Sequence, residues 1–436
     1  MRVLVVLAAL AGVAHADATI RRTACPLPAP AQVECFTLTV PANRTKPSPS
    51  TIAIPIVRFR SRSPHPLEPI VFLAGGPGVN AINHLDRQNS PFLADHDYIL
   101  FQQRGGKFSS PELACPEWTG DAAKHRAEAA ACGKRLVASG VDLDGFDTAE
   151  IVADLFDLQR ALAIPTMDLF GVSYGTRVAL EALRAQPSPH AIHAVILDSV
   201  LPPDVRYDEL ATDNALAALD RVLDQCAVDP SCARAYPDLR ARWTAALARS
   251  KRPRDLMEAV YDELNDRSHI AGIPKLVDEI ARGELAHMAK IVADNAGPSS
   301  AMRGERLSVW CRDEAPITHP ERASKHPELG GWQTVAFPPD VCRAWPVSPS
   351  SPSTNPVTSD VPVLIFAGEF DPNTPPAWGR RALATLPNGN FVELAGETHV
   401  AADGPCAISL VLAFLRDPRH LPDATCAARF PLVHFE

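Results

Sequence analysis

The chain has 436 residues, of which 46% are hydrophobic and 21% are charged, an ordinary balance for a globular protein with a sizeable core. Its formal net charge of −9 gives no electrostatic support to nucleic-acid binding. We therefore expect no nucleic acid among its partners, and the oligomeric state stays open.

The amino terminus has the pattern of an export signal. Arg2 gives a positive start, residues 3–13 are apolar, and Ala14-His15-Ala16 matches an A-x-A cleavage site. The apolar run is too short to span a bilayer comfortably, and no other segment is long and apolar enough for a transmembrane helix. We predict a signal peptide over residues 1–16, a mature chain from about Asp17, no stable membrane association after cleavage, and a periplasmic or extracellular location.

Strand and helix patterns alternate from residue 17 to residue 204. The helix predicted over 147–163 has Asp147 as its N-cap and an apolar face made by Ile151, Leu155, Leu158 and Leu162. Alternation of this kind predicts an α/β fold with a doubly wound, mostly parallel sheet. The predicted strands are an opening antiparallel pair, 33–40 and 52–60, followed by 70–74, 98–101, 167–170 and 194–198.

The apolar strand at 70–74 leads directly into the glycine-rich turn Gly75-Gly76-Pro77-Gly78. Acyl transfer builds an oxyanion that needs two fixed N–H donors, and one of them commonly comes from the loop after such a strand. We expect the backbone N–H of Gly76 to be that donor. Phosphate binding is disfavoured here, because the G-x-G-x-x-G and Walker spacings are absent and no lysine follows.

A G-x-S-x-G pentapeptide occupies residues 171–175. It follows the predicted strand 167–170 and precedes a predicted helix, 176–185, that Pro187 stops. A serine at such a strand-to-helix turn lies on a nucleophile elbow. We predict Ser173 as the nucleophile and the N–H of Tyr174 as the second oxyanion donor. The alternative is a glycine-rich turn with an incidental serine.

The strand signal disappears between residues 205 and 358. Short amphipathic helices replace it, including 213–227 and 239–249, and we expect a helical cap inserted into the core. A Pro- and Ser-rich stretch at 346–356 is typical of a surface connector. The predicted division is the first part of the core at 17–204, the cap at 205–358, and the C-terminal part of the core at 359–436.

Partners for the serine follow the cap. The apolar run 361–367 predicts a buried strand, and Asp371 follows it closely. A helix is predicted over 377–386 and a strand over 391–394, and His399 comes just after that strand. Triads with a serine on a nucleophile elbow have the chain order serine, acid, histidine, so we predict Asp371 as the acid and His399 as the base. Glu369 is a rival acid, whereas Asp403 follows His399 and breaks the order.

The ten cysteines lie in close sequential pairs. Disulfides are typical of exported proteins, and nearest-neighbour pairing is our prediction, although connectivity cannot be deduced from sequence. No pair has C-x-x-C spacing and no cysteine–histidine cluster stands out, so we predict no metal site. The predicted pairs are Cys25–Cys35, Cys115–Cys132, Cys226–Cys232, Cys311–Cys342 and Cys406–Cys426.

Six stretches follow the motifs of one known family. They are 35–44, which begins CFTLTVP, the turn LAGGPG at 73–78, the segment 103–111, which begins QRG, the elbow GVSYGT at 171–176, LDSVLPP at 197–203, and DPNTP at 371–375 with His399. Together they resemble the prolyl aminopeptidase family of α/β-hydrolases, in its secreted tripeptidyl-aminopeptidase-like branch, over nearly the whole mature chain.

This chain departs from the family pattern at several points. Ala74 stands in place of a histidine, Gln102 replaces the usual aspartate, Gly106-Lys107 replaces Thr-Gly, and Thr398 and Val400 flank His399 where glycines are usual. None of these changes removes a member of the proposed triad. They bear on substrate specificity more than on the chemistry.

The resemblance implies an exopeptidase whose cap carboxylates hold the substrate's ammonium group. The segment 307–314 resembles a cap segment in which an acidic residue follows a cysteine, which makes Asp313 and Glu314 the candidate substrate-binding residues. The alternative for these two residues is a solvated charge cluster near a disulfide.

We predict an exported serine hydrolase that removes N-terminal residues from peptides with free amino termini. The reaction proceeds through an acyl-enzyme and needs no metal or organic cofactor. Two alternatives stay open: an esterase or lipase with the same triad, and a catalytically silent binding protein. The sequence leaves open how many residues are released and whether proline is preferred.

Overall fold

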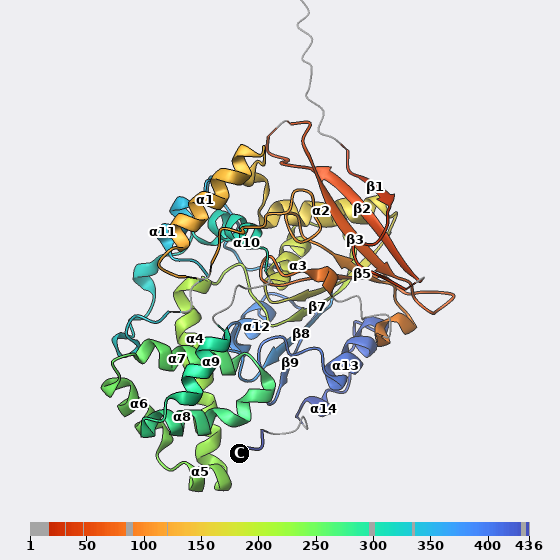
Figure 1. Ribbon diagram of the computed structural model, residues 1–436. Helices are drawn as coiled ribbons and strands as arrows, with labels where there is room; N and C mark the ends of the chain where they lie inside the picture. The colour runs from red at the N-terminus through yellow and green to blue at the C-terminus, as the bar shows by residue number, and fades with distance from the viewer. Residues whose placement is uncertain are drawn as a thin grey trace, which may run out of the picture.

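The computed structural model describes residues 17–30, 32–46, 48–83, 90–119, 121–295, 301–333, 336–428 and 433–435 (Figure 1). The predicted signal peptide, residues 1–16, lies outside the described residues. In the part of the chain that the structure describes, no helix has both the length and the apolar character that a bilayer crossing requires.

One nine-stranded sheet runs through the molecule in the order β1-β2-β3-β5-β4-β6-β7-β8-β9. The first four strands in this order, β1, β2, β3 and β5, pair with one another in antiparallel fashion. All the pairs that follow, from β5·β4 to β8·β9, are parallel. The predicted fold class, a mostly parallel doubly wound sheet, is confirmed. The strands are β1 Thr19–Arg22, β2 Val33–Pro41, β3 Thr51–Phe59, β4 Ile70–Leu73, β5 Tyr98–Phe101, β6 Met167–Val172, β7 Ile192–Asp198, β8 Val363–Gly368 and β9 Gly389–Leu394.

Helices cover both faces of this sheet, which is why its inner strands are largely apolar. Alternate residues of β4 separate the two layers: Val71 and Leu73 join one buried cluster, and Ile70 and Phe72 join the other. The first cluster includes residues of α1 His125–Ala138, α2 Thr148–Ala161, α3 Tyr174–Ala185 and α12 Pro376–Leu383, and the second includes residues of α13 Pro405–Arg416 and α14 Thr425–Ala428.

The described residues between β7 and β8 form helices and turns without a strand. The helices are α4 Tyr207–Val228, α5 Pro230–Ala235, α6 Leu239–Arg249, α7 Pro253–Leu264, α8 Ile273–Arg282, α9 Ala286–Asn295, α10 Arg303–Val309 and α11 Pro339–Ala344, with a π-helical turn at Trp310–Glu314. Residues of α4 to α8, such as Leu219, Trp243 and Val277, share a third buried cluster (green in Figure 1). Residues of α10 pack instead into the first cluster of the core. The division at 205 and 358 stays a prediction.

β7 and β8 are direct neighbours in the sheet, although the helical segment separates them in sequence. Val195 lies opposite Val363 and Asp198 lies opposite Phe366 in parallel register. The chain therefore leaves the sheet after β7 and returns on the next strand. This pairing brings the loops that carry Ser173, Asp371 and His399 to one edge of the sheet.

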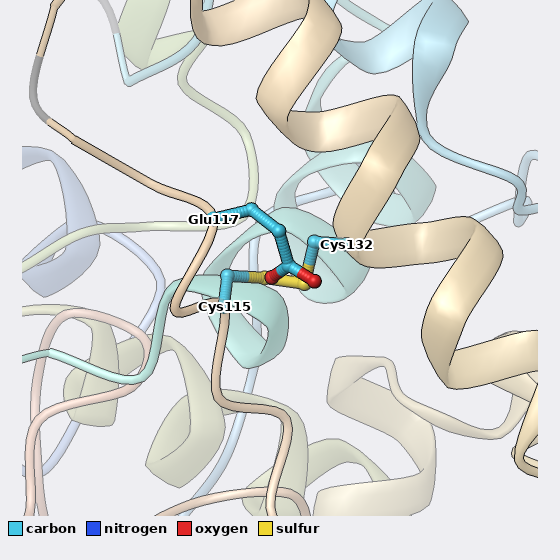
Figure 2. Close-up of side chains that lie close together, drawn as sticks. All are labelled: Cys115, Glu117 and Cys132. Atoms are coloured by element: carbon cyan, nitrogen blue, oxygen red, sulfur yellow. A yellow bond between two sulfur atoms is a disulfide. The ribbon is translucent and has the colours of Figure 1, made fainter.

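All ten cysteines are in disulfides, in the five predicted pairs. Cys115 and Cys132 join an extended segment to α1, and the carboxylate of Glu117 lies beside their sulfur atoms (Figure 2). Because both sulfurs are bonded to each other, neither can ligate a metal as a thiolate. This trio of side chains is therefore a covalent link and not a metal centre.

Candidate active site

Ser173 lies in the turn between β6 and α3. Its backbone has φ 55° and ψ −123°, a conformation that few residues other than glycine adopt. The flanking glycines are required by close approach: a Cβ at Gly175 would lie 2.0 Å from the carbonyl oxygen of Leu73, and one at Gly171 would lie 2.6 Å from the carbonyl oxygen of Gly175. This is the geometry of a nucleophile elbow, in which a strained turn exposes the serine hydroxyl.

The structure brings the three proposed triad residues into one chain of hydrogen bonds. His399 Nε2 lies 3.0 Å from Ser173 Oγ, and His399 Nδ1 lies 2.9 Å from Asp371 Oδ2. The serine and the histidine are partly buried, and the aspartate is buried. The two ring nitrogens therefore face the two partners that general-base activation of a serine requires.

Asp371 is held by the loop that follows β8. Its Oδ1 accepts hydrogen bonds from the backbone N–H groups of Asn373 and Thr374, at 2.8 and 2.9 Å. The Thr374 hydroxyl donates to its Oδ2 at 2.9 Å. The rival acid, Glu369, accepts bonds from Gln225 and from the backbone N–H of Gly396 instead. The structure thus brings Asp371, and not Glu369, to the histidine.

The acid and the base shift each other's pKa in opposite directions. Burial alone would raise the pKa of Asp371, but the charge of His399, its hydrogen bond and the backbone N–H donors together lower that pKa below its ordinary value. Burial alone would lower the pKa of His399, but Asp371, with a smaller contribution from Asp198, raises it above its ordinary value. The pair is therefore poised to stabilise an imidazolium ion.

Two residues at the end of β7 hold the histidine loop, and the sequence analysis did not identify them as such. Asp198 accepts hydrogen bonds from the backbone N–H groups of Ala401 and Ala402, both at 3.0 Å, and Ser199 Oγ accepts one from Val400 at 2.9 Å. Burial raises the pKa of Asp198 to about 6. In the sequence they appear only as an Asp-Ser pair at the end of a strand, a pattern that does not predict which loop the two side chains will contact.

The proposed oxyanion donors lie beside the nucleophile. Tyr174 is the first residue of α3, so its N–H has no acceptor within the helix. Among the described residues, neither this N–H nor that of Gly76 donates to a protein acceptor. A Cβ on the neighbouring Gly75 would lie 2.9 Å from Ser173 Cβ, which shows how closely the glycine-rich turn approaches the serine.

Asp313 and Glu314 do not lie on the wall of the cavity that contains Ser173, so the predicted ammonium-binding role does not fit their positions. Asp313 accepts hydrogen bonds from the backbone N–H and hydroxyl of Thr148 and from the Ser350 hydroxyl, at 2.7 to 2.8 Å. Thr148 Oγ1 in turn lies 2.8 Å from the hydroxyl of Tyr174. Through Thr148, Asp313 therefore helps to position the side chain of Tyr174, whose backbone N–H is a proposed oxyanion donor.

A cavity of about 740 Å³ opens above the triad, within the range of small-ligand sites. Its wall combines the glycine-rich turn and the triad residues Ser173 and His399 with side chains of the helical segment. Aromatic rings dominate that part. Charged side chains from this segment and from the core join them, none of which the sequence singled out for binding. The aromatic residues are Tyr207, Tyr261, Trp310 and Trp332; the charged ones are Glu258 and Arg306 from the helical segment and Asp198 and Asp403 from the core.

One mixed acidic and histidine cluster lies away from this cavity. Glu68, Asp168 and His193 offer ligand atoms close enough to share a cation. His193 Nδ1 already forms a hydrogen bond with Asp168 Oδ1 at 2.9 Å. Asp168 is on β6 near its start, and Ser173 follows the end of that strand, so the cluster and the triad lie at opposite edges of the sheet.

Residues 332–426 match the family model described as TAP-like protein, a segment that includes Asp371 and His399. The search of curated proteins gave no match to the chain. The match to the family model covers β8, α12, β9 and α13, which form the C-terminal part of the sheet and its covering helices.

Solved structures with likeness to this chain include several hydrolases. A proline iminopeptidase from Mycobacterium smegmatis has 18% identity and a TM-score of 0.44, with 88% of this chain and 98% of that chain covered. An esterase from Exiguobacterium antarcticum has 12% identity and a TM-score of 0.38, with 84% and 96% covered. A putative non-heme bromoperoxidase from Mycobacterium tuberculosis has 19% identity and a TM-score of 0.39, with 84% and 97% covered.

Identities and TM-scores this low say nothing about the substrate. The sheet order, the elbow and the TAP-like segment are the features that define the class of protein. By fold, this chain is an α/β-hydrolase with a TAP-like C-terminal segment.

Proposed function

We propose that this protein is an exported serine hydrolase and that it acts as an exopeptidase on peptides with a free amino terminus. The observation that carries the proposal is the continuous hydrogen-bonded chain Ser173–His399–Asp371 on the wall of a cavity. The two uncommitted N–H groups of Gly76 and Tyr174 complete the set of groups that acyl transfer needs.

In the proposed reaction, His399 Nε2 takes the proton of Ser173 as the oxygen attacks the scissile carbonyl. The N–H groups of Gly76 and Tyr174 donate to the oxyanion that forms. Asp371 keeps the imidazole in the required tautomer and stabilises its protonated form. His399 then delivers the proton to the leaving amine, and a water molecule hydrolyses the acyl-enzyme with the same histidine as the base.

Acidic groups on the cavity wall favour an amine-bearing substrate. Glu258, from α7, and Asp403, which follows the histidine loop, both line the cavity. The indole N–H of Trp332 donates to Glu258 Oε2 at 2.5 Å, which orients that carboxylate. An ammonium group is costly to bury without an anionic partner, and these carboxylates supply one. They take over the role that the sequence analysis assigned to Asp313 and Glu314.

An esterase is the second candidate, because the aromatic wall of the cavity also suits an apolar acyl group. Phe72 and Phe170 lie on the wall together with the tryptophans of the helical segment. The same triad cleaves esters and amides, so the substrate decides between the two activities.

Export is supported by the state of the cysteines. All ten are paired in disulfides, which form and persist outside the reducing cytosol. The A-x-A site at residues 14–16 precedes the described part of the chain and remains the sequence basis of this proposal.

The test uses a fluorophosphonate probe and matched substrates on the purified protein. Labelling of the parent protein and loss of labelling in Ser173→Ala are expected, with kcat lowered by roughly 10⁵ to 10⁶. Aminoacyl amides with a free amine should be cleaved at least about tenfold better than their N-acetylated forms. Equal cleavage of both forms, with simple esters preferred, would favour the esterase instead, and an unlabelled parent protein would refute the triad.

A further inference from the structure

Arg306 lines the active-site cavity and forms no ion pair with a carboxylate that the structure describes. It belongs to α10, and its guanidinium forms neither an ion pair nor a hydrogen bond with any residue that the structure describes. Its Nε is buried and has no acceptor. A buried donor costs free energy unless something accepts its hydrogen bond, so this side chain is prepared for a partner that the described chain does not supply.

The position of α10 places Arg306 close to the reacting groups. The backbone N–H of Met302, which precedes the helix, donates to the carbonyl oxygen of Gly78 at 2.8 Å, so the helix starts against the glycine-rich turn. Arg306 lies one turn further along and Trp310 one turn beyond that, and both line the cavity. The guanidinium is therefore part of the cavity wall that begins at the glycine-rich turn.

The acidic groups near Arg306, Asp208 and Glu305, do not contact its guanidinium. The oxygens of Asp208 accept hydrogen bonds from the indole N–H of Trp310 at 2.9 Å and from the backbone N–H of Ala336 at 2.8 Å. Glu305 is fully buried, and burial raises its pKa well above the ordinary value. Neither carboxyl forms an ion pair or a hydrogen bond with the guanidinium. Burial raises the pKa of Asp208 to about 6, and the charge of Arg306 acts in the opposite direction.

The cavity keeps charges of both signs apart. Glu258 and Asp403 line it together with Arg306, and the structure records no ion pair among the three. Arginine is well suited to carboxylates, because its planar fork of N–H donors can bind both oxygens. A peptide that carries an ammonium group and a carboxylate would meet a complementary charge for each.

We propose that Arg306 binds a carboxylate of the substrate and makes the enzyme selective for peptides that present one within the cavity. This inference rests on the proposed function in its peptide form. The carboxylate has two sources, the C-terminus of a short peptide or an acidic side chain, and both offer the same two oxygens to the guanidinium.

The experiment is calorimetric titration of three peptides into the full chain carrying Ser173→Ala, which binds without turnover. The peptides are Ala-Ala-Ala, Ala-Ala-Ala-amide and Ala-Ala-Glu-amide. One or both carboxylate-bearing peptides should bind roughly ten- to hundredfold more tightly than the neutral amide, as expected for a charged hydrogen bond. Tighter binding of Ala-Ala-Ala identifies the C-terminal carboxylate, and tighter binding of Ala-Ala-Glu-amide identifies the side chain.

Arg306→Gln in the same background should remove this preference, and Arg306→Lys should restore part of it. Arg303→Gln is the matched control, because Arg303 is on the same helix but lies over the rings of Trp118 and Phe337. It should keep the preference of the parent. Thermal melting confirms that each variant is folded.

Three results would overturn the inference: equal binding of all three peptides, no measurable binding of any, or a preference that survives Arg306→Gln. Failure of the proposed function is separate, since it would appear as an unlabelled parent protein in the fluorophosphonate assay. A labelled parent without a carboxylate preference would leave the hydrolase and reject the role of Arg306.

Discussion

Arg177 and Glu314 form a buried ion pair that joins the helix after the nucleophile to the helical segment above it. Arg177 Nη1 donates to Glu314 Oε2 at 2.6 Å, and the second oxygen accepts the backbone N–H of Tyr207 at 2.7 Å. One carboxylate therefore connects α3 with the start of α4 and with the π-helical turn. The ion pair thereby fixes the start of α4, which carries Tyr207 of the cavity wall, relative to α3.

Glu314→Gln should lower the free energy of unfolding by about 3 kcal/mol, because it leaves the buried guanidinium of Arg177 without a counter-charge. Urea denaturation measures this loss. Glu181→Gln is the control: that residue pairs with Arg184 one turn away at a partly exposed position, and its loss should cost less than about 1 kcal/mol. A raised KM for free-amine substrates with unchanged stability would return Glu314 to the substrate-binding role.

Asp371→Asn should lower kcat by about 10⁴ while leaving KM within a fewfold of the parent value. The asparagine amide offers an N–H where His399 Nδ1 needs an acceptor, so the imidazole takes the wrong tautomer. Steady-state kinetics on the best peptide substrate measures the effect. Glu369→Gln serves as the comparison and should retain most of kcat, since Glu369 does not contact the histidine. The reverse ranking would identify Glu369 as the acid.

Gly75→Ala should reduce kcat by at least about 10², because the added Cβ would meet Ser173 Cβ at 2.9 Å and the Val172 carbonyl oxygen at 3.0 Å. The serine or the glycine-rich turn must shift, and displacement of an oxyanion donor alone typically costs this much. Gly272→Ala is the control, since a Cβ there meets no atom within 4 Å. Single-turnover assays, with melting curves for both variants, separate a lost rate from a lost fold. Full activity in Gly75→Ala would contradict the close approach.

The pH dependence of kcat/KM should follow the protonation of His399. The base must be neutral to accept the serine proton, and Asp371 raises the pKa of this histidine above its ordinary value. Activity should therefore rise with pH, with its half-maximum above about pH 6.5. Because the carboxylate causes the shift, the residual activity of Asp371→Asn should have its midpoint at a lower pH. An unchanged midpoint in that variant would mean that a group other than His399 controls the rise of kcat/KM with pH.

Much of the sheet, and the three residues that the structure joins in the proposed triad, could be predicted from sequence, because their signals are local. A buried strand followed by a tight glycine turn determines where Ser173 lies, and the strand β8 does the same for Asp371. The close spacing of the cysteines made nearest neighbours the simplest pairing, and the pairing was confirmed. The short strand β1 was missed because its four residues, TIRR, have no apolar face, and it is held by pairing with β2.

The substrate-facing residues of the helical segment could not be predicted in the same way. Asp313 and Glu314 form an acidic pair in sequence, but the π-helical turn directs both carboxylates into bonds with Thr148 and Arg177. Glu258 and Arg306 carry no motif, and only the packing of α7 and α10 brings them to one cavity. Which polar groups face a cavity depends on tertiary contacts that no local pattern encodes.

The direct pairing of β7 with β8 has a consequence for how such enzymes can diversify. The helical segment leaves the sheet at β7 and returns to it at β8, the neighbouring strand. Its length is therefore not constrained by the distances between Ser173, Asp371 and His399. Changes in α5 to α9, which share the third buried cluster, would leave Ser173, Asp371 and His399 in register, provided that α10 and Glu314 keep their bonds to the core. Substrate selectivity could therefore change through these helices while the geometry of the proposed triad stays the same.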